Sequence, residues 1–209
     1  MHMLAIATPG ASPATRRPRA ASKHNHFLEP RQTLPIDATT ELLTLESGCL
    51  ALSHYLPDGR RQISDIVGPG RVFSIGADCR AESLTYSSVM PADMASDAYA
   101  SQGRLMLARM QAHALLLGRK TAAERVATAV LDLARQFAPR DRSSRPSRAT
   151  FILYPTRADL ADWLGLTIET ISRTLNSFKR TGLIGFDRPE RITILNQTAL
   201  ERTAGGHAA

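Results

Sequence analysis

The sequence predicts an α+β fold: a β-roll of short strands, then a long helix, then a C-terminal winged helix-turn-helix. Three observations lead to this fold class. Between residues 30 and 95, strand-like runs alternate with turns rich in Gly and Pro. Residues 98–120 keep a helical apolar periodicity without interruption, and residues 156–180 contain two short amphipathic patterns that meet at Gly165. A chain of 209 residues is long enough to bury one or two cores of this kind.

The composition is that of a globular protein in water, with 43% hydrophobic and 22% charged residues. No apolar run approaches the roughly 20 residues that a membrane helix needs. Arginines follow the short apolar patch at the N-terminus, whereas a secretion signal places its positive residues first. We therefore expect a cytoplasmic protein with no membrane partner.

The net charge of +7 is unevenly distributed along the chain. Residues 1–32 carry five Lys/Arg against one Asp/Glu, residues 33–138 ten against eleven, and residues 139–209 eleven against seven. A basic C-terminal part favours a polyanionic partner, while charge that merely aids solubility is an alternative for the N-terminal segment. Residues 1–29 are rich in Ala, Pro, Ser and Arg, and we expect them to form a disordered basic tail.

Residues 30–97 are expected to form the β-roll. Turns that combine Gly with Pro or Ser separate the strands, because Pro presets φ and Gly accepts a positive φ. The expected strands are 41–45, 49–55 and 61–67, and the expected turns are Glu46–Gly48, Leu56–Gly59 and Gly68–Gly70. Strands at this spacing indicate a small β-roll or jelly roll.

Residues 98–138 are expected to form the long helix and a second helix, which begins at the capping box Thr121–Glu124. Two apolar stripes on the long helix suggest one face for the domain itself and one for a second copy of the chain. A core helix within a single chain is the alternative. The seam expected at a homodimer interface comprises Met106, Met110, His113 and Leu117. The stripe expected to pack on the β-roll comprises Leu105, Ala108, Ala112 and Leu116.

Residues 139–209 hold the helix-turn-helix. Gly165 permits the sharp turn between the helices, and Thr167 is a plausible N-cap for the second helix. Helical spacing divides this second helix into two faces. The inner face has Ile168, Ile171, Leu175 and Phe178, and the outer face has Glu169, Ser172, Arg173, Asn176 and Arg180.

The outer side chains suit duplex DNA. Arg173 can donate to guanine O6 and N7, Glu169 can accept from cytosine N4, and Ser172 is a small adaptable partner. We assign contacts with the DNA backbone to Thr167, Asn176, Lys179 and Arg180. An exposed Glu-Arg pair on an ordinary surface helix is the alternative.

The segment ADLADWLGLTIETISRTLNSFKRTGLI resembles the DNA-binding domain of the Crp/Fnr superfamily, and Glu169-x-x-Ser172-Arg173 matches its Fnr/FixK branch. The resemblance implies a homodimeric transcription regulator acting on a TTGA…TCAA palindrome. Arg173 would contact the guanine, Glu169 the adjacent pair and Ser172 a neighbouring thymine. Residues 182–186 and 191–194 would be the strands of the wing.

The stretches ESG, LPDGRRQI and GPGRVF in the β-roll are similar to the sensor domain of the same superfamily. The resemblance therefore runs from about residue 28 to 200. It implies a FixK-like activator of genes for microaerobic respiration and nitrogen fixation that acts with RNA polymerase and without a cofactor.

Two departures from the superfamily limit the ligands that we expect. SIGADCRAESLTY lacks the Gly-Glu pair and the later Arg-Ser/Thr-Ala of cyclic-nucleotide binders, so a buried phosphate would remain unpaired and no cyclic nucleotide is expected. Oxygen-sensing members hold an iron–sulfur cluster with four cysteines, mostly near the N-terminus. This chain has only Cys49 and Cys79, which excludes that cluster, and we expect no metal.

The alternative function is a redox- or haem-responsive sensor regulator of the same superfamily. Cys79 would be its oxidisable thiol, in a stretch expected to be exposed, and His54 or His113 its histidine ligand. An enzyme is not expected, because the sequence has no Gly-rich phosphate loop, zinc-ligand spacing or nucleophile elbow.

Overall fold

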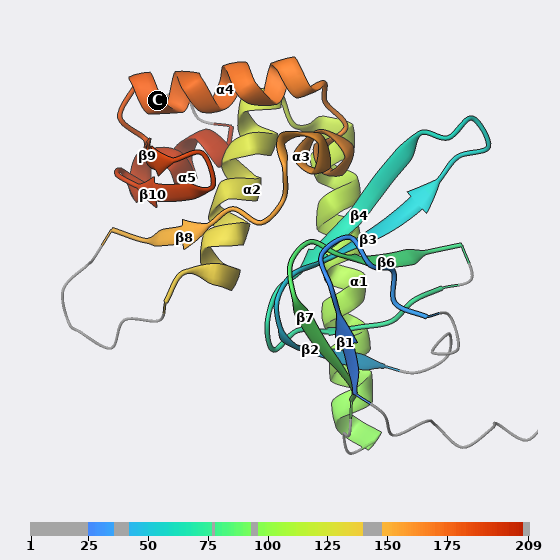
Figure 1. Ribbon diagram of the computed structural model, residues 1–209. Coiled ribbons are helices and arrows are strands. Elements are labelled where there is room, and N and C mark those ends of the chain that lie inside the picture. The colour runs from blue at the N-terminus through green and yellow to red at the C-terminus, as the bar shows by residue number, and fades with distance from the viewer. Residues whose placement is uncertain (1–24, 36–41, 77, 93–95, 140–147, 207–209) are drawn as a thin grey trace, which may run out of the picture.

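The protein consists of a β-rich N-terminal domain, a long helix and a smaller C-terminal domain with further helices (Figure 1). The computed structural model describes residues 25–35, 42–76, 78–92, 96–139 and 148–206. This mixed α and β architecture, with a helix-turn-helix in its C-terminal domain, confirms the fold class expected from the sequence.

The N-terminal domain is a β-roll of two antiparallel sheets, ordered β1-β7-β2-β5 and β4-β3-β6. Both sheets contribute to one buried apolar cluster, which includes Leu45 and Val89 from the first sheet and Leu50 and Val67 from the second. The strands are β1 His26–Leu28, β2 Leu43–Ser47, β3 Leu50–Tyr55, β4 Arg61–Val67, β5 Val72–Phe73, β6 Arg80–Ser83 and β7 Ser87–Pro91.

Two details of this domain differ from the sequence prediction. The strands on either side of Glu46–Gly48 do not pair with each other, since β2 pairs with β5 and β7 while β3 pairs with β4 and β6. The disordered tail was predicted to reach residue 29, but His26–Leu28 forms β1 against β7. The rest of that predicted tail, residues 1–24, lies outside the described residues.

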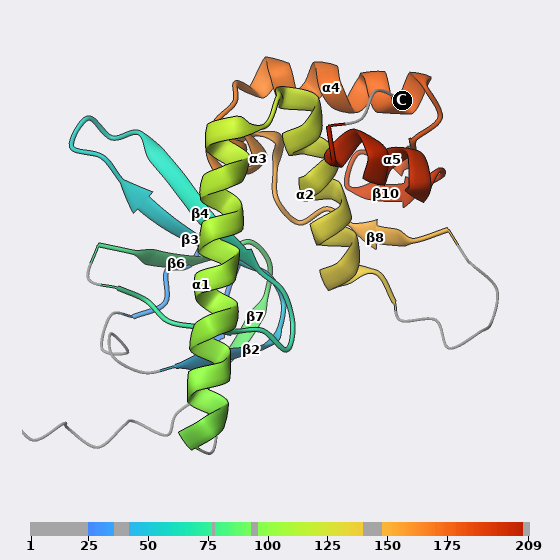
Figure 2. The same ribbon diagram turned by 180° about the vertical axis from the view of Figure 1, so that it is seen from behind.

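The long helix α1, Ser96–Arg119, packs one side against the β-roll and the C-terminal domain (Figure 2). The prediction that Leu105 and Ala108 pack on the β-roll is wrong, because both are exposed. Ala112 is also exposed, although it lines a cavity together with Ser64 and Asp65 of β4. Leu116 is the one buried member of that stripe. The inward side also carries Arg109, whose Nε lies 3.0 Å from Asp65 Oδ2 on β4. A search for apolar positions alone does not identify a charged residue as part of the inward side.

Helix α2, Ala122–Phe137, begins at the capping box that the sequence predicts. The Glu124 amide donates to the Thr121 hydroxyl, and the Glu124 carboxylate accepts from the Thr121 amide. Its buried face, which includes Val126, Val130 and Leu133, belongs to the same apolar cluster as the C-terminal domain. Helix α2 therefore connects α1 to the C-terminal domain through a shared core.

The C-terminal domain places the helix-turn-helix on a three-stranded sheet of order β8-β10-β9. Residues 140–147, between α2 and this sheet, lie outside the described residues. In the part of the chain that the structure describes, no helix is long and apolar enough to span a membrane. The elements are β8 Thr150–Ile152, α3 Arg157–Leu164, α4 Ile168–Arg180, β9 Ile184–Arg188, β10 Arg191–Ile194 and α5 Gln197–Ala204.

Candidate nucleic-acid interface

Helices α3 and α4 form a helix-turn-helix whose turn is made by Gly165. This residue has φ 60° and ψ 45°, the left-handed conformation that L side chains rarely adopt. A β-carbon here would also lie 3.2 Å from Leu117 Cδ2. The Leu166 amide donates to the Ala161 carbonyl oxygen at 3.1 Å, which closes the turn. Gly165 thus fixes the angle at which α4 leaves α3.

Helix α4 buries one side and leaves the other free. The Thr167 hydroxyl caps it by accepting from the Thr170 amide at 3.2 Å. Ile171, Leu175 and Phe178 are buried, as the sequence predicts. Ile168 was also assigned to the inner face, but it is 47% exposed because the first turn of α4 extends past the edge of the core.

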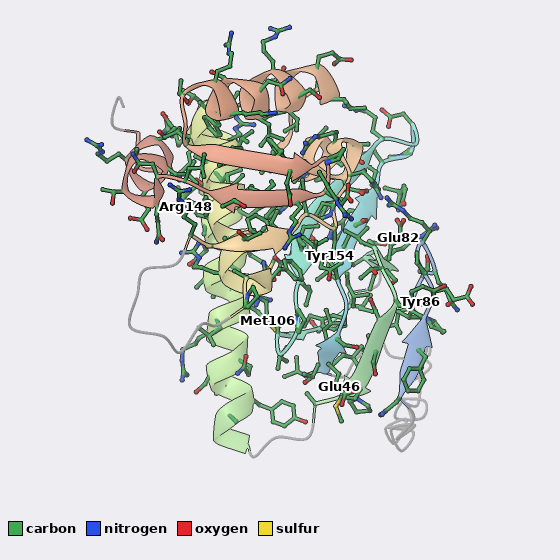
Figure 3. All side chains as sticks on the ribbon, turned by 60° about the vertical axis from the view of Figure 1, so that its left-hand side comes forward. Glu46, Glu82, Tyr86, Met106, Arg148 and Tyr154 are labelled. Carbon is green, nitrogen blue, oxygen red and sulfur yellow. The ribbon has the colours of Figure 1, made fainter. Side chains whose placement is uncertain are left out.

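The free side of α4 carries the side chains predicted to contact DNA. Helix α4 lies across one end of the molecule, and its long side chains point outward from that end (Figures 1 and 3). Ser172 is half-buried at the edge of this side. The exposed members are Thr167, Glu169, Arg173, Asn176, Lys179 and Arg180.

Glu169 is an ionised acceptor at neutral pH. Its own backbone amide and the Thr167 hydroxyl donate to its carboxylate, and the positive charge of Arg173 adds attraction, so its pKa lies below the ordinary value. An ionised carboxylate can only accept hydrogen bonds, which suits the amino group of cytosine. Among the described residues no ion pair within 4 Å joins Glu169 to Arg173, so the guanidinium is not held by this carboxylate.

Arg157 is a basic residue of the same domain that the sequence analysis missed. It is the first residue of α3, its guanidinium carbon lies 5.5 Å from the centre of the Phe186 ring on β9, and burial lowers its pKa. Its Nη1 atom is buried without a hydrogen-bond partner in the described structure. Because Nη1 is buried and the guanidinium lies over the Phe186 ring, Arg157 packs the domain in this structure and is not available to a phosphate oxygen outside it.

The wing follows α4 as the sequence predicts, although it gains a third strand. Strands β9 and β10 pair antiparallel, and β8 pairs with the other edge of β10. Arg188, the last residue of β9, is exposed beside the turn, and Arg191 Nη1 at the start of β10 lies 3.5 Å from Asp187 Oδ2. The wing thus exposes two further basic side chains on the C-terminal domain.

The residues predicted for the dimer seam divide between two sides of α1. Met106, His113 and Leu117 are half-buried inside the subunit, where the His113 ring stacks on Trp163 of α3 with centroids 6.4 Å apart. Only Met110 of the predicted seam is exposed, at 66%. Among the described residues, no other element lies over the outward side of α1 (Figure 2), which carries Leu107, Met110 and Leu115.

Cys79 was predicted to be exposed and open to oxidation, and this prediction is wrong. The residue is 8% exposed, and burial raises the pKa of its thiol. Cys49 is fully buried, and its pKa is also raised, mainly by burial. Because the thiolate is the reactive form, neither cysteine has the environment of a redox sensor. Within the described residues no group of three or more His, Cys, Asp or Glu side chains could hold a metal ion.

Comparison with known proteins agrees with this geometry. Residues 124–203 match the Crp-like helix-turn-helix domain. The nitrogen fixation regulation protein FixK of Azorhizobium caulinodans is 37% identical over 174 residues, which cover 75% of this chain and 68% of that protein. FixK of Rhizobium meliloti is 32% identical, covering 78% of each chain.

A solved structure, that of FixK2 from Bradyrhizobium japonicum, superposes with a TM-score of 0.74 at 29% identity. The superposition covers 89% of this chain and 98% of that one. The matching domain, the relatives and the shared fold agree with one another. The chain therefore belongs to the Crp/Fnr superfamily, among its FixK-like members, and is a DNA-binding transcription regulator.

Proposed function

We propose that the protein binds a TTGA…TCAA palindrome as a homodimer and activates genes for microaerobic respiration and nitrogen fixation. The observation that carries this proposal is the free side of α4, where Glu169 and Arg173 are exposed and Ser172 lies between them. Arg173 would donate to the guanine of each half-site, Glu169 would accept from the adjacent pair, and Ser172 would contact a thymine. Thr167, Asn176, Lys179 and Arg180 would bind the DNA backbone.

The homodimer is supported by the outward side of α1. Leu107, Met110 and Leu115 are 55%, 66% and 64% exposed, which is unusual for large apolar side chains so close together on one helix. A second copy packed along this helix would cover them. Two-fold symmetry would then place two α4 helices in major grooves about 34 Å apart.

The β-roll is proposed to work without a cyclic nucleotide or another cofactor. Its interior is filled by buried apolar side chains such as Leu45, Leu50 and Phe73. Arg80 is the arginine of SIGADCRAESLTY, the stretch that differs from the cyclic-nucleotide binders. It is exposed and lies over the Tyr55 ring at 5.0 Å. No charge that could pair with a buried phosphate is supplied by that arginine. The proposed activator role further requires a contact with RNA polymerase in the cytoplasm. We propose no enzymatic activity, because the relatives are regulators.

Fluorescence anisotropy with labelled duplexes tests the proposal. One duplex carries TTGA and TCAA half-sites centred about one helical turn apart, and the other carries the same bases in scrambled order. We expect affinity for the palindrome to exceed that for the scrambled duplex by on the order of 10³ or more, with both falling as salt rises. Equal affinity for the two duplexes at every salt concentration would refute the proposal.

A further inference from the structure

A cluster of five charged side chains joins the β-roll to the first helix of the helix-turn-helix. Arg61 on β4 donates from Nη2 to Asp159 Oδ1 at 2.5 Å and from Nε to Asp162 Oδ2 at 2.7 Å. Arg31, in the loop after β1, donates from Nη2 to Asp159 Oδ2 at 2.9 Å. Glu82 on β6, labelled in Figure 3, accepts from both arginines at 3.1 Å. Two arginines of one domain thus hold two carboxylates of α3.

Asp159 is the centre of this cluster and is only 1% exposed. Its carboxylate also caps α3, because it accepts from the Thr156 amide at 2.9 Å and from the Thr156 hydroxyl at 2.7 Å. Burial alone would raise its pKa, but the hydrogen bonds from Arg31, Thr156 and Arg61 bring it well below the ordinary value. A buried carboxylate of this kind is strongly destabilising when its cationic partners are removed.

The β-roll side of the cluster is held rigidly. Arg31 adopts φ 68°, the left-handed region that residues other than glycine rarely occupy. Its amide donates to the Ser83 carbonyl oxygen at 2.6 Å, which fixes the loop in this conformation. Beside the cluster, Gln62 Nε2 donates to the Trp163 carbonyl oxygen at 3.4 Å. Strained backbone that the surrounding structure maintains often marks a functional position.

We infer that Arg31 and Arg61 are positioning residues for DNA reading, which hold α3 in a fixed orientation on the β-roll. Since Gly165 fixes the angle between α3 and α4, a fixed α3 also sets the direction in which Arg173 and its neighbours face the DNA. The two halves of a palindrome are read together only if both subunits present α4 at the correct angle. This inference rests on the proposed function.

The substitution Arg61→Gln tests it, with Arg60→Gln as the matched control. Arg60 is the preceding residue, its side chain is 75% exposed, and it pairs with Asp58 of its own turn. Both variants lose one positive charge from the same hairpin, but only Arg61→Gln breaks the contact with α3. We expect Arg61→Gln to lower affinity for the palindrome by on the order of tenfold, while its affinity for scrambled DNA changes as in the control.

A readout without DNA separates the inference from the proposed operator. Trp163 is the only tryptophan of the chain and is 5% exposed beside the cluster. If the cluster holds α3 on the β-roll, acrylamide will quench Trp163 fluorescence more strongly in Arg61→Gln than in Arg60→Gln, with equal far-UV circular dichroism. Equal quenching in the two variants overturns the inference, whatever the DNA result. If the wild-type protein binds the palindrome no better than scrambled DNA, the proposed operator is wrong, and the quenching result still tests the inference.

The milder variant Asp162→Asn covers the case in which Arg61→Gln fails to fold. Asp162 is 32% exposed and accepts only from Arg61 within this cluster, so the cap of α3 at Asp159 stays intact. We expect increased quenching and weaker palindrome binding in the same direction as for Arg61→Gln, though smaller. The double variant should lose less than the sum of the two single effects, because both substitutions break the same Arg61–Asp162 contact. Full additivity, or an unchanged Asp162→Asn protein, contradicts the inference.

Discussion

The guanidinium of Arg125 donates from Nη1 to the Leu164 carbonyl oxygen at 2.9 Å, and so joins α2 to the turn of the helix-turn-helix. The same group donates from Nη2 to the Leu117 carbonyl oxygen at 2.7 Å and from Nε to that of Lys120 at 2.8 Å. One side chain therefore links the end of α1 to the end of α3. The carbonyl groups of Leu117 and Leu164 lie in the last turns of α1 and α3, where no further helical amide donates to them.

Arg125→Lys should weaken this link, because one ammonium group cannot reach both helix ends as the planar guanidinium does. We expect the free energy of unfolding to fall by about 1–3 kcal/mol, measured by urea denaturation. The control is Arg135→Lys on the same helix, where the side chain is 73% exposed and its ion pair with Asp132 spans 3.7 Å. Equal losses in the two variants would assign no special role to Arg125.

Arg173→Ala should relax base selectivity. Loss of its two proposed hydrogen bonds to guanine is expected to cost about 1–3 kcal/mol of binding to the proposed palindrome and to make one position of each half-site tolerant of substitution. Lys179→Ala, which removes the proposed contact with the DNA backbone, should weaken binding to all duplexes alike and reduce the salt dependence. Competition anisotropy with single-base variants of the palindrome measures both effects. If Arg173→Ala weakens palindromic and scrambled DNA equally, its proposed contact with guanine is wrong.

The helix-turn-helix could be predicted from the sequence because its determinants are local. Gly165 needs only its own backbone conformation, and the Thr167 cap and the buried Ile171 and Leu175 lie within one short helix. The capping box at Thr121 is local in the same way. Patterns within four residues of one another fix each of these features, so the order of the amino acids is sufficient to find them.

The cluster around Asp159 could not be predicted in this way. Arg31 and Arg61 lie 128 and 98 positions from Asp159, and no periodicity relates them. The same limitation applies to β2 and β3, which a tight turn connects although they belong to different sheets. On α1, the inward Arg109 pairs with Asp65 on β4, so a count of apolar residues alone assigned the wrong side to the core. Each of these features depends on contacts between distant segments.

The exposed side of α1 predicts where a charge should disrupt the proposed dimer. Leu107→Glu places a carboxylate among apolar side chains that the second subunit would bury, which is costly without a partner. We expect the dimer dissociation constant to rise by at least about tenfold, which corresponds to about 1.4 kcal/mol. Sedimentation equilibrium measures it, and Leu56→Glu, at a 47% exposed residue in the turn before β4, is the control. A Leu107→Glu protein that dimerises like wild type would place the interface elsewhere.

His113 should make stability depend on pH in a defined direction. Burial against Trp163 lowers its pKa below the ordinary 6.5, so the folded protein holds the ring neutral. As pH falls below about 6.5, the unfolded chain takes up a proton that the folded chain does not, and the free energy of unfolding decreases by up to about 1.4 kcal/mol per pH unit. This contribution is complete above pH 6.5 and is lost as pH falls toward the lowered pKa.

Urea denaturation of wild type and His113→Gln at pH 7.5 and 5.5 tests this sign. The wild type should lose more stability between the two pH values than the variant, in which no group titrates at this position. His54→Gln serves as the control, because His54 is exposed on β3 and is not packed against Trp163. If the pH dependence persists in His113→Gln and disappears in His54→Gln, the effect comes from His54 and the prediction for His113 is wrong. If the difference follows His113, the contact between α1 and α3 depends on a neutral imidazole, and acidification should loosen the helix-turn-helix from α1 before the β-roll unfolds.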